Sequence, residues 1–179
     1  MSRLEEIVDA AQRLLEDEGP GAVSMRRLAA ELGIQAPSLY KHVDGKDRIE
    51  AELQERALTE LAAALQPAAD LRDLAHAYRQ WALLHPRLYE LTARRPLRRD
   101  QLRDGVETAA SARLVALSGG DVDRARALWA AAHGLVDLEL AHRFPEGADV
   151  QAAWDALVAA FDRVADREDG ELDPLSRQP

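Results

Sequence analysis

The sequence predicts an all-α protein of about nine helices, with a small three-helix head followed by a larger helical bundle. Alanine is abundant and β-branched residues are sparse, a composition that favours helix over strand. Apolar residues recur every three or four positions along most of the chain, which is the period of a helix buried on one face. Glycine and proline fall between these stretches, where helices are expected to end.

Short-range signals place the three helices of the head. The predicted helices span residues 2–18, 24–32 and 35–42. Gly19 begins a Gly-Pro-Gly stretch that ends the first helix, and Ser24 is the expected N-cap of the second. Gly33 supplies the left-handed residue that ends the second helix. Pro37 lies in the first turn of the third helix, where a missing N–H costs nothing, and Leu39 is its inward anchor.

Six further helices complete the predicted fold. They are expected over residues 46–66, 70–85, 86–94, 100–117, 122–142 and 149–166. The first of these is long enough to join the head, residues 1–46, to an effector-binding and dimerisation domain, residues 47–166. The last segment, residues 167–179, is rich in Asp, Glu and Pro and is expected to be disordered.

Two helices near the C-terminus carry unusually broad apolar faces. The helix over 122–142 is nearly apolar all round, and the helix over 149–166 also has a wide apolar face for its length. We therefore expect the first to be buried on several sides, and a homodimer seam along both. The helix over 100–117 is expected to bury Leu102, Val106, Ala110, Leu114 and Leu117.

Composition excludes several kinds of site. The chain has no cysteine, which rules out disulfides, thiolate metal sites and cysteine nucleophiles. No stretch approaches the ~20 apolar residues of a membrane helix, and residues 1–6 do not begin a secretory signal, so a cytoplasmic location is expected. The net charge of −9 argues against nucleic acid as a partner. Residues 24–48 reverse that sign, with five basic residues against three acidic ones.

The two short helices joined by Leu32-Gly33-Ile34 match a helix-turn-helix, whose second helix enters the major groove of DNA. Residues 3–48, and above all the stretch from Leu32 to Lys46, resemble the DNA-binding domain of TetR-family transcriptional repressors. The stretch Trp129-Ala130-Ala131-Ala132-His133-Gly134 looks like the Trp-His-Gly signature of one C-terminal subgroup of that family. The resemblance implies a homodimer that binds a double-stranded DNA operator and is released by a small-molecule effector.

Nine residues are candidates for contacts with DNA: Arg26, Gln35, Ala36, Pro37, Ser38, Tyr40, Lys41, His42 and Lys46. Gln35 and Ser38 can hydrogen-bond to base edges, whereas Ala36 and Pro37 offer apolar surface to a thymine methyl. Ala36 stands where some family members carry a polar base reader. The aromatic and basic residues after them suit phosphates, and Lys46 adds its charge to a helix N-terminus.

Each of these residues also has an alternative interpretation. Tyr40 could be packed into the small core of the head, and Lys41, Lys46 and Arg27 could be solvated without a ligand. The resemblance implies that Arg26 contacts the groove or the backbone of DNA.

The resemblance implies an effector pocket within the helices from about residue 70 to residue 142. Ligand sites are mostly apolar with a few polar groups, which selects the candidates within these helices. The candidates are Tyr78, Trp81, Tyr89, Trp129 and His133. The alternative is that these side chains are ordinary core residues.

The basic stretch after the predicted helix over 86–94 has two interpretations. Its arginines could bind an anionic effector, or they could form a solvated loop, which is the preferred expectation; they are Arg94, Arg95, Arg98 and Arg99.

Two readings from other classes remain open. Asp73 and His76, and likewise Glu139 and His142, are three residues apart on predicted helices, as in di-metal carboxylate bundles. A helical protein-interaction module would use the same C-terminal apolar faces. No nucleophile elbow, phosphate-binding loop or zinc-protease motif is present, so the sequence predicts a regulator that is not an enzyme and needs no metal or cofactor.

Overall fold

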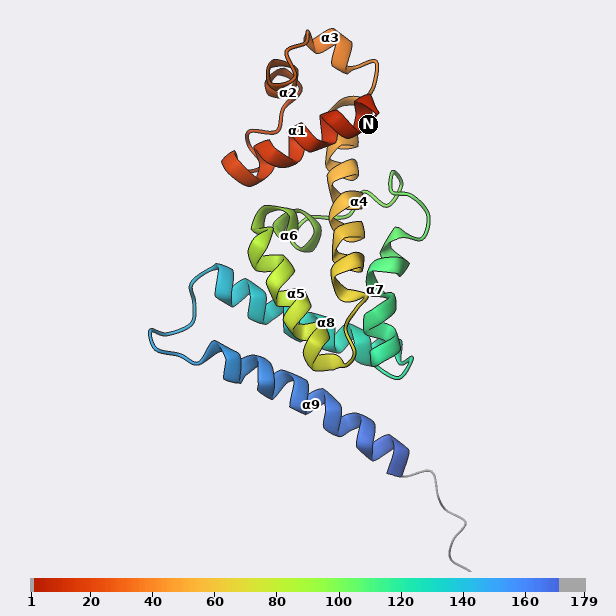
Figure 1. Ribbon diagram of the computed structural model, residues 1–179, viewed down its shortest axis with the longest axis vertical. Helices are drawn as coiled ribbons and strands as arrows, with labels where there is room; N and C mark the ends of the chain where they lie inside the picture. Colours follow the sequence, from red (N-terminus) through yellow and green to blue (C-terminus); the bar gives the residue numbers. More distant parts are fainter. Residues whose placement is uncertain (1, 171–179) are drawn as a thin grey trace, which may run out of the picture. The chain divides into compact units, whose positions relative to one another are not determined.

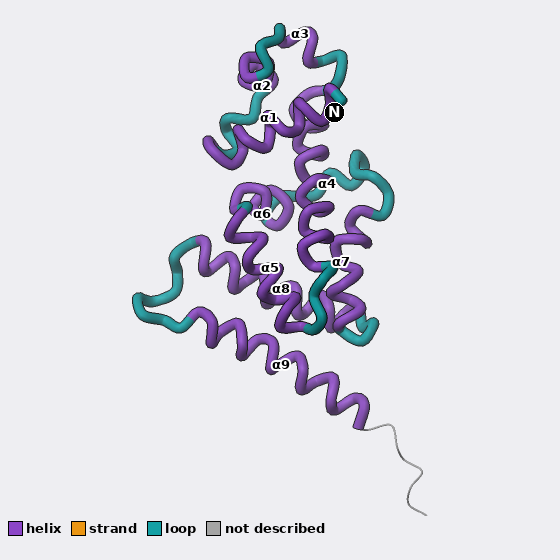
Figure 2. The backbone as a smooth tube through the Cα atoms, in the orientation of Figure 1, coloured by secondary structure: helices purple, strands orange, loops and turns teal. Residues whose placement is uncertain are grey.

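The computed structural model describes the backbone of residues 2–170 and the side chains of residues 2–162. Over this range the chain forms helices and no strand, as Figures 1 and 2 trace. The helices are α1 (Arg3–Glu18), α2 (Met25–Glu31), α3 (Ala36–Leu39), α4 (Gly45–Leu65), α5 (Leu71–Leu84), α6 (Pro86–Ala93), α7 (Val106–Leu117), α8 (Val122–Leu140) and α9 (Val150–Gly170). The all-α prediction of about nine helices is confirmed for this range. None of these helices has the length and hydropathy to cross a membrane.

Two compact units make up the chain. The first contains residues 1–63 and 84–110, so α6 and the segment after it belong with the head and most of α4. The second contains residues 64–83 and the chain from residue 111 onward, including α5, α8 and α9. The predicted functional boundary between residues 46 and 47 stays a prediction. Residues 171–179 of the predicted acidic tail lie outside the described residues.

The local signals of the head act as predicted. The Ser24 hydroxyl accepts a hydrogen bond from the backbone N–H of Arg27 at 3.3 Å, which makes it the N-cap of α2. Gly33 has φ +65° after α2 ends. The N–H of Ile34 bonds to the carbonyl of Ala29 at 2.9 Å, and the N–H of Gly33 to that of Ala30 at 3.1 Å. This is a Schellman motif, in which a left-handed residue satisfies the last carbonyls of the helix.

The end of α3 and the start of α7 differ from the prediction. Helix α3 ends at Leu39, and the chain continues as a turn in which the N–H of His42 bonds to the carbonyl of Leu39. Helix α7 begins at Val106 and not near residue 100. The backbone N–H groups of Arg98 and Arg103 instead donate to the side chains of Gln54 and Glu55 on α4, which holds this stretch out of a helix.

The apolar residues of α7 and α8 are less buried than predicted. On α7 only Val106 is buried, and Ala110, Leu114 and Leu117 are half-buried, as is Leu102 in the loop before it. On α8 the buried residues are Ala125, Leu128, Ala132 and Val136, and α8 packs with α9 in the second unit. Val122, Trp129 and Leu138 are exposed large apolar residues of the same helix. The single chain therefore buries one side of α8 and leaves others uncovered.

Helix α9 begins at Val150 and extends to Gly170, past its predicted end near residue 166. Trp154 and Val158 are buried on it, whereas Ala152, Ala156 and Ala160 are exposed at four-residue spacing on another face.

Candidate functional site

The candidate DNA-binding surface consists of α2, the turn after it, α3, the turn that follows α3 and the first turn of α4. Leu28 and Ala29 on α2 and Leu39 on α3 are buried in the head, and Leu39 is 0% exposed. Gln35 is the N-cap residue of α3, with extended backbone angles and no capping hydrogen bond from its side chain. These anchors leave the rest of α3 and the following turn facing outward.

The structure places the nine DNA-contact candidates on the surface. Ala36 and Ser38 are half-buried, and the other candidates are exposed: Arg26, Gln35, Pro37, Tyr40, Lys41, His42 and Lys46. Tyr40 is 56% exposed, so it does not pack into the core of the head. Its alternative interpretation as a core residue is therefore wrong.

Some basic residues of this surface are paired with carboxylates and others are not. The Arg27 guanidinium lies 2.7 Å from the Glu18 carboxylate, and this hydrogen bond together with the charge of Glu18 raises the pKa of Arg27. Arg48 is likewise paired with Glu52. Among the described residues, none forms an ion pair with the remaining bases of the surface, which are Arg26, Lys41 and Lys46.

Lys46 lies in the first turn of α4, where backbone N–H groups lack helical partners. An ammonium group beside outward-pointing N–H groups suits an anion such as a phosphate. Gly45, which begins the helix, has φ +84°, a conformation that favours glycine.

The effector candidates do not gather at one described cavity. Tyr78 and Trp81 on α5 are buried in the second unit, and Tyr89 on α6 is buried in the first. Trp129 and His133 stack on α8 with ring centroids 5.8 Å apart, and Trp129 is 47% exposed. Their assignment to an effector pocket stays a prediction.

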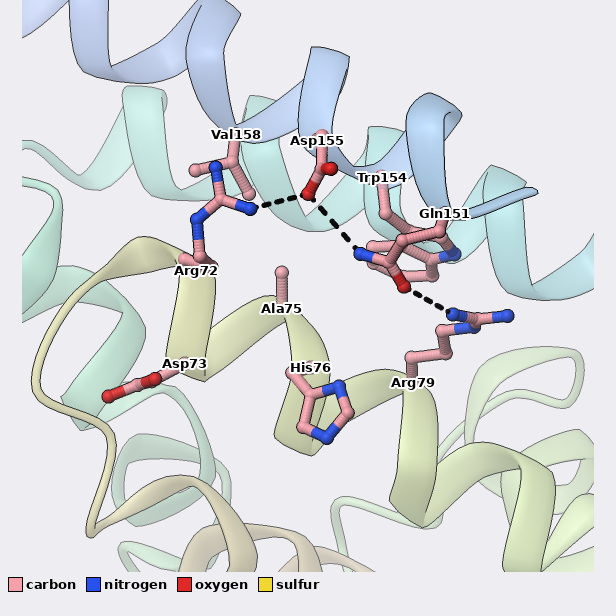
Figure 3. A pocket seen from close by; sticks show the side chains of 9 residues that line it. All are labelled: Arg72, Asp73, Ala75, His76, Arg79, Gln151, Trp154, Asp155 and Val158. Carbon is pink, nitrogen blue, oxygen red and sulfur yellow. Dashed lines mark hydrogen bonds and ion pairs between the residues drawn. The ribbon is translucent and has the colours of Figure 1, made fainter. Parts of the chain in front are cut away.

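A groove of ≈ 370 Å³ lies between α5 and α9 in the second unit (Figure 3). Ala75, Trp154 and Val158 provide its apolar lining. Its polar residues form a chain: the Arg72 guanidinium lies 2.5 Å from Asp155, which accepts a hydrogen bond from Gln151.

The chain continues at the other end of the groove. Arg79 donates to Gln151 at 3.0 Å and makes a bidentate pair with Glu139, and its guanidinium lies 6.0 Å from the centre of the Trp154 ring. The sequence interpretation missed this groove. Arg72, His76 and Arg79 repeat at four- and three-residue steps on α5, and this spacing was the available signal.

The alternative of a di-metal site finds no support in the geometry. Within the described residues no group of three or more potential ligands converges. Arg79 occupies both oxygens of Glu139, and Asp73 accepts a hydrogen bond from the backbone N–H of Ala69. His142 lies beyond the end of α8 and is exposed.

Arg94, Arg95 and Arg99 after α6 are exposed, as expected for this loop, and Arg98 is half-buried. Arginines of this loop also form ion pairs. Arg95 pairs with Glu50 at 3.6 Å and Arg98 with Asp47 at 3.1 Å, both on α4. Arg99 pairs with Glu107 at 2.8 Å, and its hydrogen bond to that carboxylate raises the pKa of Arg99.

A helix-turn-helix head with an exposed second helix, followed by a separate helical unit, defines the class of ligand-responsive DNA-binding regulators. Residues 7–53 match the sequence model of the bacterial regulatory proteins of the tetR family, and residues 71–161 match that of the tetracyclin repressor-like C-terminal domain. The chain belongs to the TetR family of DNA-binding transcriptional regulators. This confirms the resemblance and the prediction of a regulator that is not an enzyme.

Known proteins similar to this chain agree with the family. The helix-turn-helix-type transcriptional regulator Rv0681 of Mycobacterium tuberculosis is 32% identical over 151 residues, which are 76% of this chain and 69% of Rv0681. The regulator YobS of Bacillus subtilis is 37% identical over 91 residues, 47% of this chain and 48% of YobS. The match therefore spans about half the length of YobS. The crystal structure of the regulatory protein SCO4313 aligns with a TM-score of 0.75 and 28% identity, over 88% of this chain and 94% of SCO4313.

Proposed function

We propose that this chain is a cytoplasmic repressor that works as a homodimer, binds a double-stranded operator through α3 and the turn after it, and is released by a small molecule. One observation carries the proposal. The only fully buried side chain of α3 is that of Leu39, while Gln35 and the residues from Tyr40 to His42 are exposed and Lys46 has no ion-pair partner in the described part of the chain.

The candidate residues divide into two groups by chemistry. Gln35 and Ser38, at the start of α3, carry the neutral donors and acceptors that read base edges. Lys41 and Lys46 carry charges that suit phosphates and position the protein without reading sequence. Arg26 on α2 and the aromatic ring of Tyr40 belong with the second group.

The exposed apolar surface of α8 and α9 supports a homodimer through these two helices. Trp129 and Leu138 are large apolar side chains left uncovered on different sides of α8, and exposed apolar surface commonly marks a protein interface. The small residues of α9 at 152, 156 and 160 would let a second copy approach closely. A dimer also doubles the cationic surface and presents two recognition helices to half-sites about 34 Å apart.

We propose that the effector binds either at the aromatic candidates or elsewhere in the second unit. Tyr78, Trp81, Tyr89, Trp129 and His133 remain the proposed pocket residues, and the groove between α5 and α9 is a further candidate. Three tryptophans in the chain, two of them among these five, make intrinsic fluorescence a direct way to screen small molecules.

Selection of bound duplexes from a random DNA library tests the proposal. The full chain should enrich one sequence with two related half-sites, and its affinity should fall steeply as salt rises. The matched control is Gln80→Ala, which changes an exposed α5 residue outside the head and should leave selection unchanged. A folded, dimeric protein that enriches no sequence would refute operator binding and favour an interaction module without DNA.

A further inference from the structure

The segment from His85 to Arg103, hereafter the clasp segment, is tied to the DNA-binding head by side chains of α1 and α4. It comprises α6 and the loop that precedes α7 and lies in the same compact unit as the head. Two of its attachments are directional hydrogen bonds to backbone groups.

The first attachment is at the N-terminus of α6. Its own N-cap residue, His85, makes no capping hydrogen bond with its side chain. The carboxylate of Glu16 on α1 instead accepts hydrogen bonds from the backbone N–H groups of Arg87 at 3.3 Å and Leu88 at 3.2 Å. These are the N–H groups that an N-cap side chain normally satisfies, and a carboxylate there is also favoured by the helix dipole. A residue of the head therefore caps α6.

The second attachment is Gln54 on α4, which is 0% exposed. Its amide nitrogen donates to the carbonyls of Leu91 at 3.2 Å and Pro96 at 3.1 Å, and its amide oxygen accepts from the N–H of Arg98 at 2.9 Å. Both hydrogens of the amide and its oxygen are thus used by backbone groups of one segment. These three hydrogen bonds can form together in only one position of the clasp segment relative to α4. A shift of the segment would leave buried polar groups without partners.

Ion pairs surround these hydrogen bonds. Glu50 and Glu55 on α4 face Arg95 and Arg103, and the guanidinium of Arg48 donates to the carbonyl of Gln101 at 2.7 Å. The arginines of these pairs are largely exposed, and exposed ion pairs contribute little free energy. The specificity of the attachment is therefore assigned to the buried amide and the helix cap.

We propose that Glu16 and Gln54 are positioning residues that hold α1 and α4, and with them the recognition surface, in the arrangement that binds the operator. This inference rests on the proposed operator-binding function. Loss of either residue would shift the population towards arrangements that lack these contacts, and operator affinity would fall with the fraction of chains in the arrangement described here.

The test compares Gln54→Met and Glu16→Ala with the matched controls Gln80→Met and Asp17→Ala, which change exposed residues. Affinity is measured for the selected operator duplex and for a scrambled duplex, at a temperature where each variant is folded. Both test variants should bind the operator about tenfold more weakly, within the range of typical couplings between sites. Binding to the scrambled duplex should change less than twofold, since the phosphate contacts are intact. Operator affinity within twofold of the unchanged chain would overturn the inference while leaving the proposed function standing.

A second measurement needs no variant. Hydrogen exchange at the amides of Arg87, Leu88 and Arg98 should slow when the selected operator duplex is added, although none of these residues is a proposed DNA contact. Unchanged exchange at all three amides would contradict the positioning role. If the unchanged chain enriches no duplex, it is the proposed function that fails.

Discussion

The turn between α2 and α3 and the surface of α8 are built by the same local rules but end in different states. Ser24 caps α2 and Asp121 caps α8, and each helix closes with a Schellman motif. In the head, the apolar anchor Leu39 is then fully covered by its own chain. On α8, Trp129 and Leu138 are not. Local signals decide where a helix begins and ends, whereas coverage of its apolar sides depends on what packs against it. For α8 the proposed cover is a second copy of the chain.

The largest expected effect is at the covered anchor. Leu39→Ala should lower the free energy of unfolding by about 2–5 kcal/mol, because it removes a fully buried side chain and leaves a cavity. Urea denaturation followed by circular dichroism measures this. The matched change on α8, Leu138→Ala, removes an exposed side chain and should cost below about 1 kcal/mol at concentrations where the chain is monomeric. An equal loss in the free energy of unfolding for the two variants would contradict the difference in burial between the two regions.

Trp129→Glu tests the uncovered region. A charge at the centre of an apolar interface should weaken dimerisation by at least about 2 kcal/mol, or roughly 30-fold in the dissociation constant. Sedimentation equilibrium of the full chain measures the shift.

The control for this change is Gln80→Glu, which adds the same charge to an exposed position of α5 and should leave the dimer intact. The proposed seam is wrong if Trp129→Glu leaves the dimer as stable as before, or if the unchanged chain is monomeric at all accessible concentrations.

The DNA-contact candidates should separate into two kinds of effect of about 1–3 kcal/mol each. Lys46→Ala should weaken binding to every duplex alike and lower the salt dependence by about one unit, since a phosphate contact is lost. Gln35→Ala should instead change which base is preferred at one position of each half-site. Titration of the selected operator and of single-base variants at several salt concentrations distinguishes the two. Loss of sequence preference in Lys46→Ala, or a uniform loss in Gln35→Ala, would contradict the assigned roles.

How far the sequence could predict this molecule depends on the range of the interactions. The cap at Ser24 and the left-handed Gly33 are signals confined to a few neighbouring residues, and both were predicted from the sequence. The clasp segment was not. Gln54 bonds to backbone groups more than 35 residues away. Every residue type has a backbone carbonyl, so the sequence does not show which carbonyl a glutamine side chain will bind.

The same limit explains the error at the start of α7 and the ambiguity of the aromatic candidates. The predicted start of this helix near residue 100 failed because Gln54 and Glu55 hold the N–H groups of Arg98 and Arg103. Aromatic identity alone does not separate a core residue from a pocket residue, and Tyr89, 2% exposed, illustrates that ambiguity.

The smallest expected effect concerns the end of α8. His142 has φ +51° and occupies the left-handed position of the Schellman motif, with its N–H bonded to Glu139 at 3.0 Å and the N–H of Arg143 bonded to Leu138 at 2.8 Å. A side chain with a Cβ is strained there, so His142→Gly should raise the free energy of unfolding by about 0.5–1 kcal/mol. The gain is limited because glycine also loosens the unfolded chain.

The corresponding position of α2 should respond with the opposite sign. Gly33 has φ +65°, and Gly33→Ala adds the strain that His142→Gly removes, at a cost of about 1–2 kcal/mol. Calorimetry of both variants at one protein concentration is required, since the proposed dimerisation would make the melting temperature concentration-dependent. A lower melting temperature for His142→Gly would mean that the imidazole stabilises the helix end by more than the left-handed backbone costs. The expectation that glycine is the more stable residue at the end of both helices would then be wrong for α8.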